Sequence, residues 1–298
     1  MELVTRTITQ RERDHAPIIV APIGDIQWAG QRGPTALDTL KRHIDLCLER
    51  EAWYVGLGDY IDFLSPSNRQ RVKSAALYDT ANDVIDDAAL HLVYELYDTV
   101  LKPTTGRWLG LVHGHHWAQL QTGETTDQRL CQLLQAKFLG TSAFIRLLFK
   151  NPNSETRCPL TIFVHHGCGG GMKASAPLNR LENILPYWDA DIFLIGHMTK
   201  QAVAPINRIS PRWAGNNAPD LVHRKIYLVG CGGFAKGYDK GASLGNVPMG
   251  GYVEQSLMNP ASLGAPLIKI VPRRDYTIAG GGASSRRGVW APDVTVEI

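Results

Sequence analysis

Five short segments of the sequence place Asp or His beside Gly, and side chains of these types bind divalent metal ions. The segments are Gly24-Asp25-Ile26-Gln27, Gly58-Asp59-Tyr60-Ile61-Asp62, His113-Gly114-His115-His116, His165-His166-Gly167 and Gly196-His197-Met198-Thr199. Carboxylate oxygens and imidazole nitrogens are metal ligands, and glycine permits the tight turns that aim them. A single segment of this kind is usually only a turn or a hydrogen-bonded residue. Five in succession indicate one shared chemical site.

Each of these segments directly follows a short apolar run whose length and β-branched residues are typical of a buried strand. The runs are Ile18–Ile23, Trp53–Leu57, Trp108–Val112, Leu160–Val164 and Asp191–Ile195. In α/β proteins the carboxyl ends of the strands line one crevice. We therefore expect the five strand ends to converge.

Amphipathic segments between the runs predict helices. Between the first two runs, apolar residues recur at helical spacing from Leu37 to Leu48, and similar stripes predict helices over Asp79–Leu101, Thr126–Phe138 and Leu178–Leu185. Beyond residue 200, Gly and Pro separate short strands. These predicted strands are Lys225–Val229 and Pro266–Val271, and Gly280–Val289 is expected to be a loop or tail. The alternation of strands and helices predicts an α/β fold.

The composition is that of a globular protein. With 298 residues, of which 44% are hydrophobic and 20% charged, we expect one domain over residues 1–298, with a helical insertion at about 65–107 and a strand-rich part at about 220–298. The net charge of +3 does not by itself indicate nucleic-acid binding. The sequence does not indicate an oligomeric state.

Cysteine usage and the N-terminal segment bear on localisation. The five cysteines form no C-x-x-C pair, which argues against a disulfide framework or a zinc finger and favours a reducing cytoplasm. The N-terminal residues have no apolar signal core, and no run of about 18 apolar residues occurs. We therefore predict a cytoplasmic protein without a membrane partner.

The five segments resemble the motifs of the calcineurin-like metallophosphoesterases, which run D-x-H, G-D-x-x-D, G-N-H, H-G and G-H-x-H. The resemblance extends from Ile18 to Thr199 in the same order, and Tyr252-Val253-Glu254 and Leu263-Gly264 loosely resemble the tails of phage-type members. It implies a four-layer α/β/β/α sandwich, in which two mixed β-sheets are flanked by helices and two metals occupy the crevice.

The resemblance also implies a role for each matched residue. Asp25 would bind the first metal, and Asp59 would bridge both metals with its two oxygens. His166 and His197 would bind the second metal. His116 would protonate the leaving group or stabilise the developing charge.

The sequence departs from the family pattern at three positions. Gln27 replaces the His of D-x-H, His115 replaces the Asn of G-N-H, and Thr199 replaces the last His. The first metal would then have only oxygen ligands, namely Asp25, Asp59, Gln27 and Thr199. The second would gain His115. Imidazole favours Mn, Zn, Ni or Fe, whereas oxygen ligands suit Mg or Mn.

The implied reaction is hydrolysis of a phosphate ester by a metal-bound hydroxide. We expect a phosphodiesterase acting on nucleotides or nucleic acid ahead of a phosphomonoesterase. A degenerate member retained as a binding or assembly module, and a mononuclear hydrolase of other esters, stay open as alternatives.

The preference for a nucleotide depends on neighbouring residues. Trp28 and Trp117 stand near predicted ligands and could stack on a base, although ordinary packing is the alternative. Gly169 and Lys200 could contact a phosphate, against the alternative of a flexible loop and a solvated surface residue. A basic segment with Arg69, Arg71 and Lys73 could guide a strand, although such runs are usually only solvated.

The substituted motifs predict an asymmetric metal content. We expect the His-rich site to hold a transition metal tightly, and the oxygen-rich site to hold labile Mg²⁺ or Mn²⁺ or no ion. Anomalous scattering from an untreated, freshly purified sample should show one strong transition-metal peak. Two equally occupied transition-metal positions would contradict this assignment.

Overall fold

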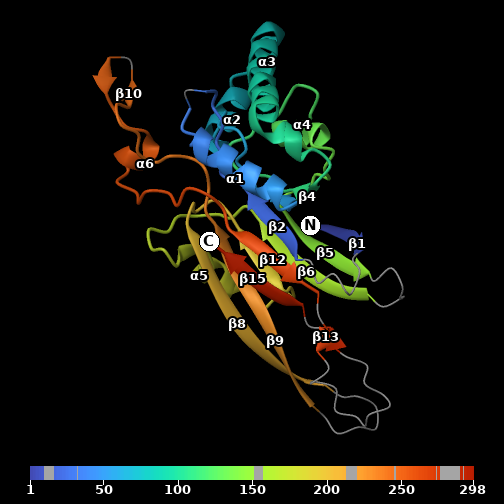
Figure 1. The fold of residues 1–298 in the computed structure, drawn as a ribbon. Coiled ribbons are helices and arrows are strands. Elements are labelled where there is room, and N and C mark those ends of the chain that lie inside the picture. Colours follow the sequence, from blue (N-terminus) through green and yellow to red (C-terminus); the bar gives the residue numbers. More distant parts are fainter. Residues whose placement is uncertain are drawn as a thin grey trace.

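The architecture contains two mixed β-sheets with helices on their outer faces (Figure 1). It is seen in a computed structural model that describes residues 1–9, 17–31, 33–150, 157–212, 220–244, 246–272, 274–275, 289–290 and 292–298. The six-stranded sheet has the order β1 (Glu2–Thr9), β5 (Ser142–Lys150), β6 (Arg157–His165), β7 (Ile192–Ile195), β9 (Asp220–Cys231) and β8 (Gln201–Arg212). The five-stranded sheet has the order β15 (Asp293–Glu297), β12 (Leu267–Val271), β2 (Ile18–Ile23), β3 (Trp53–Gly56) and β4 (Trp108–Leu111).

The two sheets pack against each other through an apolar layer. Val20, Val55 and Leu109 of the five-stranded sheet belong to the same buried cluster as Ile162 and Leu194 of the six-stranded sheet. Residues of a strand alternate between its two faces, so each sheet contributes one face to this shared layer.

Helices cover the outer face of each sheet. The helices α1 (Leu37–Glu49) and α3 (Asp79–Leu96) pack on the five-stranded sheet, and α5 (Ala176–Ile184) packs on the six-stranded sheet. The remaining helical elements are α2 (Pro66–Ser74), the π-helical η1 (Tyr97–Leu101), the 3-10 helix η2 (Lys102–Thr104), α4 (Thr126–Leu133) and α6 (Tyr252–Gln255). Short two-stranded ribbons are formed by β10 (Ser243–Leu244) with β11 (Val247–Pro248), and by β13 (Arg274–Asp275) with β14 (Val289–Trp290). The prediction of an α/β fold with two mixed sheets is therefore confirmed.

All five apolar runs are strands, and their directions bring the site segments together. In the five-stranded sheet β2, β3 and β4 are parallel. In the six-stranded sheet β6 and β7 are parallel. Parallel neighbours end at the same edge of a sheet, so each sheet delivers its motif segments to one edge.

The predicted helices form, but two have different ends. The segment Asp79–Leu101 is α-helical to Leu96 and then widens into η1. The helix predicted over Thr126–Phe138 ends at Leu133, because the chain then returns to the sheet edge. There Phe138 pairs with Leu111, and the Leu139 N–H donates to the Leu111 carbonyl over 2.8 Å.

The prediction missed α2 and the strands β1, β5, β8 and β15. Strand β5 shows alternating burial along its length, as expected of a strand with one face in the core. The segments predicted as strands Lys225–Val229 and Pro266–Val271 lie within β9 and largely within β12. Most of the predicted loop Gly280–Val289 lies outside the described residues.

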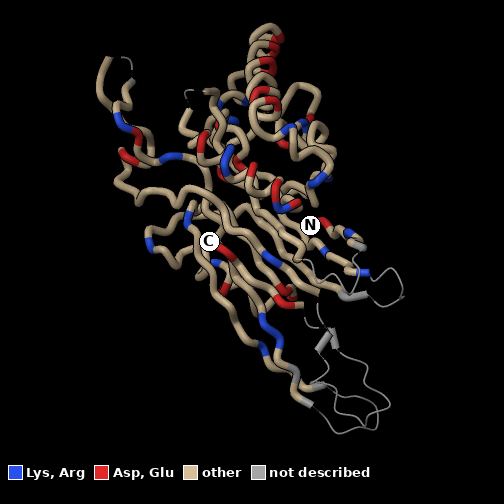
Figure 2. Tube along the Cα trace, in the orientation of Figure 1, with Lys and Arg blue, Asp and Glu red and all other residues tan. Residues whose placement is uncertain are grey.

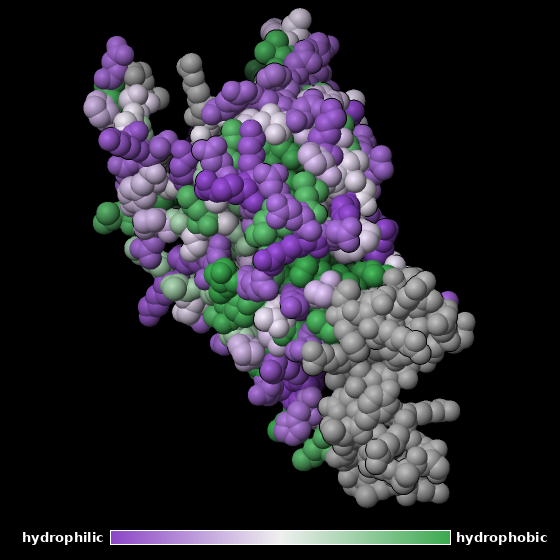
Figure 3. Space-filling model, viewed as in Figure 1, coloured by the Kyte–Doolittle hydropathy of each residue, from purple (hydrophilic) through white to green (hydrophobic). Residues whose placement is uncertain are grey.

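The described surface is polar around the helices. Acidic residues recur along α3 in Figure 2, and Figure 3 shows mostly hydrophilic residues at the end of the molecule where α2 and α3 lie. Among the described residues, no helix combines the length and apolarity needed to span a bilayer.

A half-buried histidine on α1, His43, links the stability of the fold to pH. The ring of His43 lies 5.5 Å from the ring of Phe234, centroid to centroid, and its Nε2 atom has no hydrogen-bond partner among the described residues. Burial lowers the pKa of His43 to about 4. Protonation therefore favours the unfolded chain.

Replacing His43 should flatten the pH dependence of stability in the acid range. An unfolded His near 6.5 takes up a proton that the folded His43 does not, so stability present above pH 6.5 is lost as the pH falls towards 4. The variant His43→Leu should remove about 3 kcal/mol of this loss at pH 4. Urea unfolding of both proteins in EDTA at pH 7, 5.5 and 4 measures the difference. Parallel stability curves for variant and wild type would show that His43 does not titrate in this way.

Candidate metal centre

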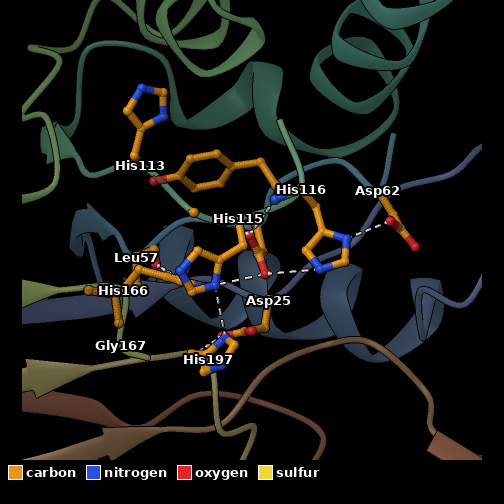
Figure 4. A network of polar contacts seen from close by, with 12 residues as sticks. Asp25, Leu57, Asp62, His113, His115, His116, His166, Gly167 and His197 are labelled. Carbon is orange, nitrogen blue, oxygen red and sulfur yellow. Dashed lines mark hydrogen bonds and ion pairs between the residues drawn. The ribbon is translucent and has the colours of Figure 1, made fainter. Parts of the chain in front are cut away.

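Four side chains from four strand ends meet in one group (Figure 4). The group consists of Asp59, His115, His166 and His197, whose candidate ligand atoms all lie within 4.8 Å of one another. Asp59 and His166 are buried, and the other two are half-buried. Three imidazoles and one carboxylate are a donor set suited to a transition metal.

Both sheets contribute to this group. Asp59 follows β3 and His115 follows β4, whereas His166 and His197 follow β6 and β7. Backbone hydrogen bonds join the loops after β2 and β3, from Asp25 N–H to the Gly58 carbonyl and from Gln27 N–H to the Asp59 carbonyl, each over 2.9 Å. A Cβ atom on Gly114 would overlap the backbone of Asp59, so only glycine permits this approach of the two loops.

The backbone of the site is strained. Among the described non-glycine residues with positive φ are Asp25 (φ 49°), Gln27 (49°), Asp59 (53°), His197 (65°) and Thr199 (49°). Such conformations cost about 1–3 kcal/mol each and cluster at functional sites. All five of these residues belong to the motif segments.

His166 is oriented by a backbone carbonyl. Its Nδ1 lies 2.6 Å from the Leu57 carbonyl oxygen, which only accepts, so Nδ1 donates. In the neutral ring the lone pair then resides on Nε2, which lies 3.2 Å from Asp59 Oδ2. That Nε2 atom and Oδ1 of Asp25 are buried without a hydrogen-bond partner among the described residues. Buried acceptors left in this way fit a cation.

The pKa values show how the group behaves without a metal. Burial opposes the charged form of His166, but the Asp59 carboxylate outweighs it and raises the pKa of His166 to about 9. Burial likewise opposes ionisation of Asp59, yet His166 holds the pKa of Asp59 well below its usual range. At neutral pH a proton therefore lies between Nε2 of His166 and Oδ2 of Asp59, and a metal cation would have to displace that proton.

The other two imidazoles are available as neutral ligands. Burial, assisted by the positive charge of His166, lowers the pKa of His197 to about 4. Burial also lowers the pKa of His115. Their Nδ1 atoms lie 3.3 Å apart. At neutral pH both rings keep a lone pair for a metal.

The oxygen-rich side is less complete. Asp25 is 1% exposed, and one of its oxygens accepts from the His197 N–H over 2.8 Å. Burial raises the pKa of Asp25 to about 7. Asp25 lies outside the four-residue group. Gln27 belongs to the same loop as Asp25, and both Asp25 and Thr199 lie close to Gly233. The predicted His-rich ligands thus form one group with Asp59, and the predicted oxygen ligand Asp25 does not belong to it.

His116 stands at the edge of the group. Its Nδ1 lies 2.7 Å from Asp62 Oδ1, and its Nε2 lies 3.9 Å from Asp59 Oδ2. The hydrogen bond to Asp62 raises the pKa of His116. The ring is therefore oriented with one nitrogen on Asp62 and the other towards the centre, as Figure 4 shows.

Arg69 has a role that sequence reasoning missed. Its Nη1 donates to the carbonyls of Leu64, His115 and Trp117, and its guanidinium lies 4.0 Å from the centroid of the Trp117 ring. Arg69 therefore holds the loop that carries His115 and His116. Its place after the second motif was visible in the sequence, but charge alone gave no sign of these contacts.

Asp127 supports the same loop from α4. It is 2% exposed, and its Oδ2 lies 2.8 Å from His113 Nδ1. The His113 ring stacks on Trp117 at 4.7 Å. Nothing in the spacing of Asp127 indicated this contact.

Of the residues predicted to contact substrate, Trp28, Trp117 and Lys200 make contacts within the protein. The prediction for Trp28 is wrong, because it is fully buried and its indole N–H donates to Glu95, so no base can reach it. The ring of Trp117 is already in contact with Arg69 and His113. Lys200 Nζ donates to the Gly171 carbonyl, which ties the loop after β6. Gly169 is exposed in that loop.

Comparison with known proteins does not identify a relative. No protein-family model matches the chain, and no curated protein matches it significantly. We therefore infer the function from the residues of the site.

Two adjacent histidines provide a matched test of the metal centre. His166→Gln should lower the affinity for Zn²⁺, Mn²⁺ or Co²⁺ by at least about 100-fold, because it removes a buried ligand. His165→Gln is the control, since His165 lies outside the group and only accepts from the Gly167 N–H, which Gln can also do. Titration calorimetry and the visible spectrum of bound Co²⁺ measure the effect. Equal affinity in both variants would remove His166 from the centre.

Proposed function

We propose that this protein is a metal-dependent hydrolase of phosphate esters, with the calcineurin-like phosphoesterase fold. The observation that carries the proposal is the buried group of Asp59, His115, His166 and His197, with His116 oriented beside it by Asp62. These residues lie on the motifs that resemble the calcineurin-like family, and the two mixed sheets are compatible with that fold.

A divalent cation held by this group would act as a Lewis acid on the phosphate and would lower the pKa of a coordinated water. The protein's own residues would orient it. Leu57 fixes the tautomer of His166, and Asp59 would offer Oδ2 to the centre while Oδ1 accepts the backbone N–H groups of His115 and His116. With Oδ1 engaged, the orientation of the carboxylate is set before any ligand binds.

His116 is suited to deliver a proton. Asp62 holds its Nδ1, so the proton on Nε2 is the one available to a departing alkoxide. Since 28% of its side chain is exposed, His116 can also reach solvent and be reprotonated. The leaving group would thus depart on the side of His116.

Two observations limit the proposal. Trp28 is buried and the Trp117 ring is in contact with Arg69, so neither ring supports stacking on a nucleotide base. These residues therefore no longer favour a phosphodiester substrate over a phosphomonoester. The substituted first-site positions Gln27 and Thr199 favour a second candidate, a family member retained for binding. The oriented His116–Asp62 pair favours the enzyme, because binding alone does not require it.

Turnover of a substrate panel tests the proposal. The purified protein should hydrolyse bis-p-nitrophenyl phosphate or p-nitrophenyl phosphate in Mn²⁺, Zn²⁺, Ni²⁺ or Mg²⁺, and should not hydrolyse p-nitrophenyl acetate. His116→Gln should lower turnover by about 100-fold or more with metal retained. The loss should be larger for phenyl than for p-nitrophenyl esters, because a poorer leaving group depends more on a proton donor.

The controls separate chemistry from folding. His165→Gln should keep wild-type turnover, and metal content is measured for each variant. Absence of turnover with every metal and phosphate ester would overturn the hydrolase assignment and favour the binding module. Turnover of the acetate ester alone would instead indicate another class of esterase.

A further inference from the structure

A groove adjoins the metal centre on the side of α5. It has a volume of about 480 Å³ and is lined by the loop before α5, one face of that helix and Met198. Met198 directly follows His197, and the loop residues Gly169–Gly171 follow His166. The groove is therefore lined by the segments that directly follow His166 and His197, two of the candidate metal ligands.

The charge of the groove is positive. Lys173 and Arg180 are among its lining residues, and no Asp or Glu is. Both are exposed, and neither takes part in the ion pairs found among the described residues. Figure 2 shows a basic residue on the loop that precedes α5. Unpaired cations in a concave surface attract phosphate groups.

Arg180 reaches the loop that follows His166. Its guanidinium lies against the loop after β6, since a Cβ on Gly169 would come within 2.7 Å of Nη2. Gly169 has a φ of +73°, so this close approach also requires glycine. We therefore assign the phosphate contact predicted for Gly169 to the Arg180 side chain, which lies against Gly169.

The remaining lining residues suit the base and sugar of a nucleotide. Asn179 and Asn183 are one helical turn apart on α5 and are exposed into the groove. Their amides can donate to and accept from polar base edges. Met172 and Met198 add thioethers, which adapt to aromatic faces.

We propose that this groove binds the nucleotide that flanks the reacting phosphate in a nucleic-acid strand, with Arg180 and Lys173 on its phosphate. This inference rests on the proposed function in placing the strand beside the metal centre. Binding itself is measurable without turnover, so the two proposals can fail separately.

Binding of a fluorescein-labelled decathymidylate is the test. Anisotropy is followed in EDTA, where hydrolysis does not occur, at several salt concentrations. The charge reversal Lys173→Glu with Arg180→Glu should raise Kd at least about 10-fold. It should also lower the slope of log Kd against log salt by about 1.4, the value for two phosphate contacts on a single strand. Arg180→Gln alone should have a smaller effect in the same direction.

The matched control reverses the same charge elsewhere. Lys41 and Arg42 are exposed on α1, which covers the opposite sheet. Lys41→Glu with Arg42→Glu should change Kd by less than about twofold. The proposal that the groove binds nucleic acid would be overturned if the wild type did not bind the oligonucleotide, or if both double variants lost affinity equally. Inorganic polyphosphate competing as well as unlabelled oligonucleotide at equal charge would overturn its assignment to a nucleotide.

Discussion

The site depends on the contact between Asp59 and His166. Both are buried, and Nε2 of His166 faces Oδ2 of Asp59 over 3.2 Å. Because the Nδ1–H of His166 donates to the Leu57 carbonyl, a neutral His166 presents the lone pair of Nε2 to a carboxylate. Positive charge must lie between them, whether a proton or a metal ion. The rest of the centre is arranged around this requirement.

The surrounding fold holds the two partners in place from opposite sheets. Asp59 comes from the five-stranded sheet and His166 from the six-stranded sheet, so the apolar layer between the sheets fixes their separation. Gly114 lets the loops approach, and Arg69 ties the loop after β4. Arg69 is not a candidate ligand, but its hydrogen bonds to the carbonyls of His115 and Trp117 help to position His115.

The proposed chemistry and the proposed recognition belong to different surfaces. The centre is partly buried and strained, as expected where ligands are held before any ion binds. The groove beside α5 is lined by the cationic side chains of Lys173 and Arg180 and by no acidic residue. Binding at the groove and turnover at the centre can therefore be measured separately.

The sequence by itself determined the five strands and the residues at their ends, because strand composition and Asp, His and Gly are local signals. It also indicated Asp59, His115, His166 and His197 as ligands of one metal. Only the tertiary structure decided that Trp28 is buried, that Arg69 holds a loop and that Arg180 lies against Gly169. Burial and the direction of a long side chain depend on distant segments, which spacing along the chain does not encode.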